Sequence, residues 1–281
     1  MDTTSLADTP DELIRMAVER LHNSSTALIK LSPDPGGKLT ANLIGSGTFV
    51  TFGQVHGILT AHHVVRGLTG QYSLGLTGAR EGEEHNLVVT RENLRICNIA
   101  IPETDEYGPD LAFIYLASWN DVCTIKASRS FHPLEHDRQE MLTGPPAADL
   151  GIWFACGVPG ERVTEVKSEK GFERLLSYQH WCGAGGANRE SDRGDWDYVE
   201  MDVDNDPARG LPASFGGMSG GGLWQVTVAK TSAGALQPRR ALYCGVIFYQ
   251  RANPDGTRTL RCHGRRTVYD HAFRAVKDGP A

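Results

Sequence analysis

The spacing of apolar residues changes near residue 25, and this change separates an opening helix from a long β-rich part. In the opening part, apolar residues recur at helical intervals, at Leu13, Ile14, Ala17, Val18 and Leu21. This spacing predicts a helix over Pro10–Leu21, with Thr9 as its cap and Glu12 completing a capping box. We expect the apolar face of this helix to pack on a β-barrel rather than to bind a partner.

From Ser25 onward, short apolar runs alternate with Gly, Pro, Asn and Asp, which is typical of strands joined by turns. The predicted strands are Ala27–Leu31, Gly47–Phe52, Gly57–Ala61, Asn86–Val89, Asp110–Leu116, Gly151–Cys156, Arg174–His180, Tyr198–Val203, Gly222–Val228 and Ala241–Tyr249. A second helix is predicted over Thr267–Lys277. Strands and helices do not alternate regularly, so we expect an all-β protein with a helix near each end.

The order of the predicted elements indicates five segments. They are a helical extension over 1–24, a first β-barrel over 25–118, an inter-barrel linker with weak periodicity over 119–149, a second β-barrel over 150–250, and a C-terminal hairpin and helix over 251–281.

Composition and charge narrow the classes of function. The chain has 281 residues, with 28 Lys and Arg against 34 Asp and Glu, so its formal net charge is −6. This balance argues against a nucleic-acid-binding protein, which needs a concentrated basic surface. The chain shows neither a basic start followed by an apolar run nor an apolar stretch of about 18 residues. We therefore expect a cytoplasmic protein without a membrane partner.

The six cysteines are far apart, at Cys97, Cys123, Cys156, Cys182, Cys244 and Cys262. They form no C-x-x-C pair, which argues against a zinc site. Their even number would permit three disulfides, but we expect free and mostly buried thiols in a reducing compartment.

Three separated fragments contain the residue types of nucleophilic catalysis. An apolar strand ends at the paired histidines His62 and His63, Asp110 precedes another apolar strand, and Ser219 lies among glycines. A serine hydroxyl becomes a good nucleophile when a histidine accepts its proton, and a buried carboxylate orients that histidine. The glycines around Ser219 allow the backbone amides of Gly217 and Ser219 to turn inward and form an oxyanion hole.

The order His–Asp–Ser, with T-A-x-H-V, D-L-A and G-x-S-G-G, resembles the chymotrypsin/trypsin-like serine protease family. The resemblance covers about residues 25–249 and is strongest to the disulfide-free bacterial branch, similar to the protease domain of the high-temperature-requirement proteins. It implies two antiparallel six-stranded β-barrels with the site in the cleft between them. It also implies that His63, rather than His62, is the general base, with Asp110 as its orienting carboxylate and Ser219 as the nucleophile.

The resemblance further implies a substrate pocket lined by Ala213, Ser214, Phe248 and Tyr249, suited to a small or apolar side chain. Two positions depart from the family pattern. Met218 stands where zymogen-activated relatives have an aspartate that pairs with the new N-terminus, so we expect a partner or the substrate to order the site. Phe248 stands where relatives often have a serine that supports the catalytic aspartate, which leaves Asp110 without that support.

Two hypotheses of function follow. The first is a serine endopeptidase that hydrolyses protein or peptide substrates through an acyl-enzyme and needs no cofactor. The alternative is a protease-fold binding module, or a latent effector subunit that a regulatory protein partner activates in a stress or defence assembly. In that alternative, the two terminal helices are the candidate docking surfaces.

Other patterns are weaker candidates for sites. Asp105 is an alternative third member of the triad, but no apolar strand follows it. His132 and His136 have the i, i+4 spacing of a helical metal site, but Pro133 disfavours a helix there, so we expect a solvated linker and no metal. The run 202–206 resembles the start of a calcium loop but lacks its glycine and glutamate. The acidic run over 192–206 predicts a solvated loop that could also steer basic substrates.

Overall fold

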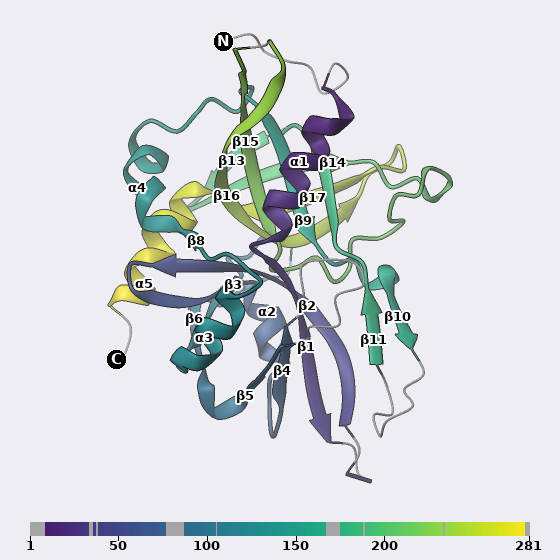
Figure 1. Ribbon diagram of the computed structural model, residues 1–281, viewed down its shortest axis with the longest axis vertical. Coiled ribbons are helices and arrows are strands. Elements are labelled where there is room, and N and C mark those ends of the chain that lie inside the picture. The colour runs from purple at the N-terminus through teal and green to yellow at the C-terminus, as the bar shows by residue number, and fades with distance from the viewer. Residues whose placement is uncertain are drawn as a thin grey trace.

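The computed structural model describes residues 9–33, 36–37, 39–76, 87–104, 106–166, 175–187, 189–232 and 234–278. Their strands form two large and mainly antiparallel sheets, the first built before and the second after residue 150 (Figure 1). The expected fold class is confirmed, with two antiparallel sheets and a helix near each end. The family resemblance implies six strands in each barrel, whereas the hydrogen-bonded sheets of the described residues contain eight and seven.

The first sheet has the strand order β5-β4-β1-β2-β3-β7-β6, and β8 pairs with β2 in parallel. Its strands are β1 (Ser25–Pro33), β2 (Leu39–Phe52), β3 (Val55–Thr60), β4 (Ser73–Leu76), β5 (Leu87–Thr90), β6 (Leu94–Ala100), β7 (Leu111–Leu116) and β8 (His132–Pro133). Aliphatic and aromatic residues of these strands share a core with Tyr198 and Phe248 from the second half of the chain, so the sheet is held mainly by apolar burial.

The second sheet has the order β12-β9-β15-β16-β17-β14-β13, and β10 and β11 form a separate hairpin. Its strands are β9 (Ile152–Gly157), β12 (Trp181–Gly185), β13 (Arg189–Arg193), β14 (Trp196–Val203), β15 (Gly222–Lys230), β16 (Leu236–Ala252) and β17 (Arg258–His263). The hairpin consists of β10 (Val163–Val166) and β11 (Leu175–Tyr178).

Each terminal helix packs mainly against the sheet from the other half of the chain (Figure 1). The first helix, α1 (Asp11–His22), contacts β16 of the second sheet. At the other end, a π-helical turn (Thr267–Ala272) leads into α5 (Phe273–Lys277), where Phe273 packs edge-on against Phe52 of β2 at 5.6 Å between ring centroids. The two terminal segments therefore tie the halves of the molecule together.

The start of α1 differs from the expected capping box. Pro10, rather than Thr9, occupies the N-cap position, and no side chain caps the helix there. The Glu12 carboxylate instead accepts from Arg15, with Nη2 at 2.6 Å. Glu12 therefore pairs with Arg15, one turn farther along the helix, instead of completing a capping box.

The segment expected to be a linker contains two helices, α3 (Trp119–Lys126) and α4 (Leu134–Thr143). Pro133 is the N-cap residue of α4, so His132 precedes the helix and the i, i+4 helical spacing is not realised. His132 Nε2 lies 3.3 Å from Asp137 Oδ2 in a partly buried setting. The expectation of a solvated linker is therefore wrong, because apolar contacts of Leu134 and Met141 hold α4 on the core.

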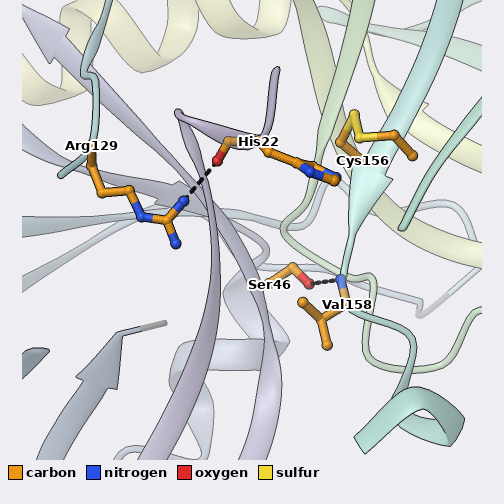
Figure 2. The surroundings of a disulfide bond; sticks show 6 residues. His22, Ser46, Arg129, Cys156 and Val158 are labelled. Carbon is orange, nitrogen blue, oxygen red and sulfur yellow. Dashed lines mark hydrogen bonds between the residues drawn. A yellow bond between two sulfur atoms is a disulfide. The ribbon is translucent and has the colours of Figure 1, made fainter. Parts of the chain in front are cut away.

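Two of the cysteines form a disulfide, Cys156–Cys182, between directly opposed residues of β9 and β12 (Figure 2). The expectation of free thiols is therefore wrong for this pair. Cys97, Cys123, Cys244 and Cys262 are free, and the last two are buried. Cys156 and Cys182 are 26 positions apart, and only the register of the two strands places them side by side. A short stretch of sequence therefore does not reveal this pair.

Short helical elements complete the described structure: α2 (His62–Arg66) and the 3-10 turns Arg91–Asn93, Gly160–Arg162 and Pro207–Arg209. Among the described residues, no helix combines the length and apolar character that a membrane crossing requires.

Candidate active site

The pairing of β3 with β7 brings His63 and Asp110 together at one edge of the first sheet. These strands are antiparallel neighbours, with Thr60 at the end of β3 opposite Ala112 near the start of β7. The helix α2, which follows β3, therefore lies beside the residue that precedes β7. His63 Nδ1 is 2.5 Å from Asp110 Oδ2, and the His63 backbone amide donates to Oδ1 at 2.9 Å.

These two bonds fix the imidazole and its tautomer. When Nδ1 of a neutral ring donates to a carboxylate, Nε2 keeps the lone pair that can accept a proton. Asp110 is buried, with 2% of its surface exposed. Burial raises the pKa of Asp110, but the hydrogen bonds and the charge of His63 outweigh that effect and hold the pKa below its ordinary value. The carboxylate is therefore ionised at neutral pH and can stabilise an imidazolium.

A second histidine supports Asp110, and the sequence analysis missed it. His263 of β17 is fully buried. Its Nε2 lies 3.0 Å from the backbone nitrogen and 3.1 Å from the backbone oxygen of Asp110, so the neutral ring can bond that backbone in either tautomer. The ring also stacks on Phe248, with 4.6 Å between centroids. Phe248 thus takes part in the support of Asp110 through His263 rather than leaving that residue unsupported.

The titration of His263 makes a prediction for stability. Burial lowers the pKa of His263 to about 4, whereas an unfolded histidine titrates near pH 6.5, about the reference value. The unfolded chain therefore binds the extra proton first, so stability falls as the pH drops from about 6.5 to about 4. We expect this residue to lower the free energy of unfolding by about 2 kcal/mol between pH 7 and pH 5. Urea denaturation should show a smaller pH dependence for His263→Gln, and equal dependence in both proteins would contradict this.

Ser219 lies in the loop Gly216–Gly221, called here the Ser219 loop, immediately before β15. Backbone hydrogen bonds tie this loop to β16: the Gly220 amide donates to the Ile247 carbonyl at 2.7 Å, and the Ile247 amide donates to the Gly221 carbonyl at 2.9 Å. The nucleophile candidate is therefore held at a fixed place beside the second sheet.

The structure brings all three predicted triad residues to one cavity. His63, Asp110 and Ser219 line a pocket of about 290 Å³ between the two sheets. Among the hydrogen bonds of the described residues, none joins the Ser219 hydroxyl to the His63 ring. Such a bond is often long in a free enzyme and tightens when substrate binds, so the arrangement is compatible with proton transfer from Ser219 to His63.

The backbone amides of residues 217–221 fall into two groups. Those of Met218, Gly220 and Gly221 donate to backbone carbonyls. Those of Gly217 and Ser219, the two predicted oxyanion donors, donate to no group in the described part of the chain. The φ of Gly217 is +95°, and a Cβ there would lie 2.8 Å from backbone atoms of the neighbouring segment, so only glycine fits. Two unpaired donors beside a hydroxyl are suited to binding a developing negative charge.

Only two of the four residues predicted to form the substrate pocket line this cavity. Phe248 and Tyr249 line the cavity, whereas Ala213 and Ser214 are absent from its described lining. The amides of Ala213 and Ser214 instead donate to the Glu161 carboxylate, at 2.7 and 3.1 Å. This carboxylate holds the segment that precedes the Ser219 loop, and the sequence pattern gave no sign of that contact.

Other residues form the wall that Ala213 and Ser214 were expected to provide. Phe215, Gly216, Gln250 and Leu260 line the cavity. The Gln250 side chain is fixed, since its Oε1 accepts from the Phe215 amide at 2.9 Å and its Nε2 donates to Ser214 Oγ at 3.2 Å. These residues present apolar surfaces with one amide, and Arg66 also lines the cavity.

Among the weaker candidates that the structure describes, His62 is absent from the lining of the cavity. The ring of His62 is largely buried, burial lowers its pKa, and its Nδ1 bonds to no group among the described residues. Asp105 lies outside the described residues. Within the described ranges, no three His, Cys, Asp or Glu side chains are grouped as a metal site would require.

The acidic run is not the solvated loop that the sequence predicts, because much of it lies on β13 and β14. Asp197 accepts from the amides of Arg266 and Thr267, at 2.8 and 2.7 Å. Glu200 is buried and pairs with Arg261 at 2.7 Å. These carboxylates therefore anchor β17 and the C-terminal helical segment, since basic and polar groups of that segment face them.

Comparison with known proteins adds little to this geometry. No family model and no curated protein matches the chain. The chain is similar to a solved structure from work on the coupled folding and binding of the intrinsically disordered Sesbania mosaic virus VPg protein. The identity is 15%, the match covers 90% of this chain and 91% of that chain, and the TM-score is 0.43. At this TM-score the similarity contributes no argument about function.

Proposed function

We propose that this protein is a serine endopeptidase with His63, Asp110 and Ser219 as its catalytic triad. The observation that supports this most strongly is the arrangement around one cavity. It combines an imidazole bonded to a buried carboxylate, a serine that lines the same cavity, and the backbone amides of Gly217 and of that serine, which donate to no group among the described residues.

The proposed reaction uses only groups of the chain. Ser219 Oγ attacks the carbonyl carbon of a peptide bond while His63 Nε2 accepts the hydroxyl proton. The amides of Gly217 and Ser219 bind the oxyanion of the tetrahedral intermediate. His63 then donates its proton to the leaving amine, which gives an acyl-enzyme. A water molecule, deprotonated by His63, hydrolyses the ester and regenerates the serine.

The cavity disfavours a basic side chain on the acyl side of the cleaved bond. Its lining includes Phe215, Leu260 and the fixed amide of Gln250, together with the positively charged Arg66. Among the described lining residues, the only carboxylate is that of Asp110, which His63 already engages. A basic substrate side chain would therefore lose its hydration without gaining an ion pair.

A fluorophosphonate probe tests the proposal directly, because it reacts with a serine only when a neighbouring base and oxyanion donors activate the hydroxyl. We expect the native full-length chain to be labelled at Ser219, as located by mass spectrometry of the digested protein, and His63→Ala to be labelled far more slowly. Absence of labelling in the folded protein would contradict the endopeptidase proposal and favour the binding-module alternative.

A further inference from the structure

The orientation of the two oxyanion amides depends on where the carbonyls before them are held. The Gly216 carbonyl accepts from the Gly160 amide at 2.6 Å, and the Met218 carbonyl is bound within the Ser219 loop. In a planar trans peptide, a carbonyl and the N–H that follows it point in opposite directions. These two bonds therefore turn the N–H groups of Gly217 and Ser219 away from the interior contacts and leave them for a ligand.

Ser46 of β2 reaches the same loop from the first sheet. Its hydroxyl donates to the Gly217 carbonyl at 2.8 Å. The same hydroxyl accepts from the Val158 amide at 2.9 Å, a bond that Figure 2 shows. Its backbone amide donates to the Ser219 carbonyl at 2.8 Å. Val158 lies two residues before Gly160, so the Ser46 hydroxyl joins the Ser219 loop to the segment whose amide holds that loop in place.

The surroundings of Ser46 leave no substitute for its hydroxyl. The residue is fully buried, and the Thr60 hydroxyl holds its carbonyl at 2.8 Å. A Cβ at Gly45 would lie 2.9 Å from the Ser219 carbonyl oxygen, so β2 and the loop are in close contact. Met218 is also fully buried and apolar, so this position of the loop supplies no ion pair that could hold it instead.

We propose that the Ser46 hydroxyl is a positioning group that keeps the oxyanion amides turned toward the cavity. The inference rests on the proposed endopeptidase function and adds the device that holds its oxyanion hole. Without this hydroxyl, the segment 158–160 can separate from the loop, and the Gly216–Gly217 peptide can rotate so that a carbonyl faces the developing charge. Because Ser46 is absent from the described lining of the cavity, its loss should affect the transition state more than substrate binding.

The variant Ser46→Ala tests this, with Ser25→Ala as a matched control. Ser25 is also buried in the first sheet, and its hydroxyl bonds to no group within the described residues. We expect Ser46→Ala to lower kcat by about 10- to 100-fold with KM within about twofold, and to slow fluorophosphonate labelling similarly, because the loss of an oxyanion donor acts on kcat. Hydrogen–deuterium exchange should accelerate in peptides that contain Gly216–Gly221. Ser25→Ala should match the native protein in kinetics, labelling and exchange.

If circular dichroism shows that Ser46→Ala is unfolded, Ser46→Cys takes its place, since a thiol fills similar space but is a weak donor. Native kcat together with native exchange in a folded variant would overturn the positioning role while the proposed function stands. If the native protein does not react with the probe, the proposed function fails separately. The exchange data then decide whether Ser46 holds the loop: faster exchange supports that role and unchanged exchange overturns it.

Discussion

Replacing Ser219 with alanine should lower kcat for peptide cleavage by about 10⁴- to 10⁶-fold, because the variant retains no side chain that can form the acyl-enzyme. The fold should not change, since Ser219 Oγ makes no hydrogen bond within the described residues and the bonds of the Ser219 loop use backbone atoms. Cleavage of a peptide library, followed by mass spectrometry, measures the loss over the required range.

The matched control for this variant is Ser191→Ala, which removes an exposed serine of β13, an edge strand of the second sheet. We expect Ser191→Ala to cleave at the native rate. A Ser219→Ala protein that cleaves the same bonds at a rate near the native one would remove Ser219 from the mechanism. The activity would then have to come from another group or from a contaminating protease.

Replacing Asp110 with asparagine should lower kcat by about 10⁴-fold while the fold is retained. The amide of asparagine can donate to His63 Nδ1, which favours the tautomer that carries its proton on Nε2 and cannot act as the base. The neutral side chain also fails to stabilise the imidazolium formed during the reaction. Steady-state kinetics at neutral pH measures the effect, with the exposed Asp149→Asn as the control that should leave kcat unchanged.

The dependence of stability on pH in the acid range provides a second test of Asp110. Its pKa is lowered in the folded protein, so the ionised carboxylate contributes stability above the ordinary carboxyl pKa, and this contribution is lost as the pH falls below that value. Asp110→Asn should lack this contribution at neutral pH. A variant with native kcat would show that His63 does not need the carboxylate and would contradict the triad.

The three candidate catalytic residues carry local signals in the sequence, whereas the groups that support them do not. His63, Asp110 and Ser219 each follow or precede an apolar strand, and turn or glycine signals in the adjacent sequence mark them. Such local signals were sufficient to select three candidates that the structure brings to one cavity. His263 had no such signal, because it ends a strand of mixed polarity that the alternation of apolar residues did not reveal.

The lack of local signals also explains two wrong expectations. Cys156 and Cys182 were expected to be free thiols, and Ala213 and Ser214 were expected to line the pocket. Cys156 and Cys182 oppose each other only because β9 and β12 pair in one particular register. Glu161 binds the segment before the Ser219 loop although 52 residues separate it from Ala213. No pattern within a short window of sequence records which distant strands will become neighbours.

The sequence by itself determined the β-rich class, a helix near each end and the chemical types of the three candidate catalytic residues, because these follow from periodicity, turn residues and side-chain chemistry within short windows. Tertiary structure decided which groups hold those residues in place. Asp110 meets His263 across 153 positions, and Ser46 meets Gly217 across 171. Contacts of this kind arise from the register and packing of the two sheets, where burial makes each polar group depend on a partner supplied by a distant part of the chain.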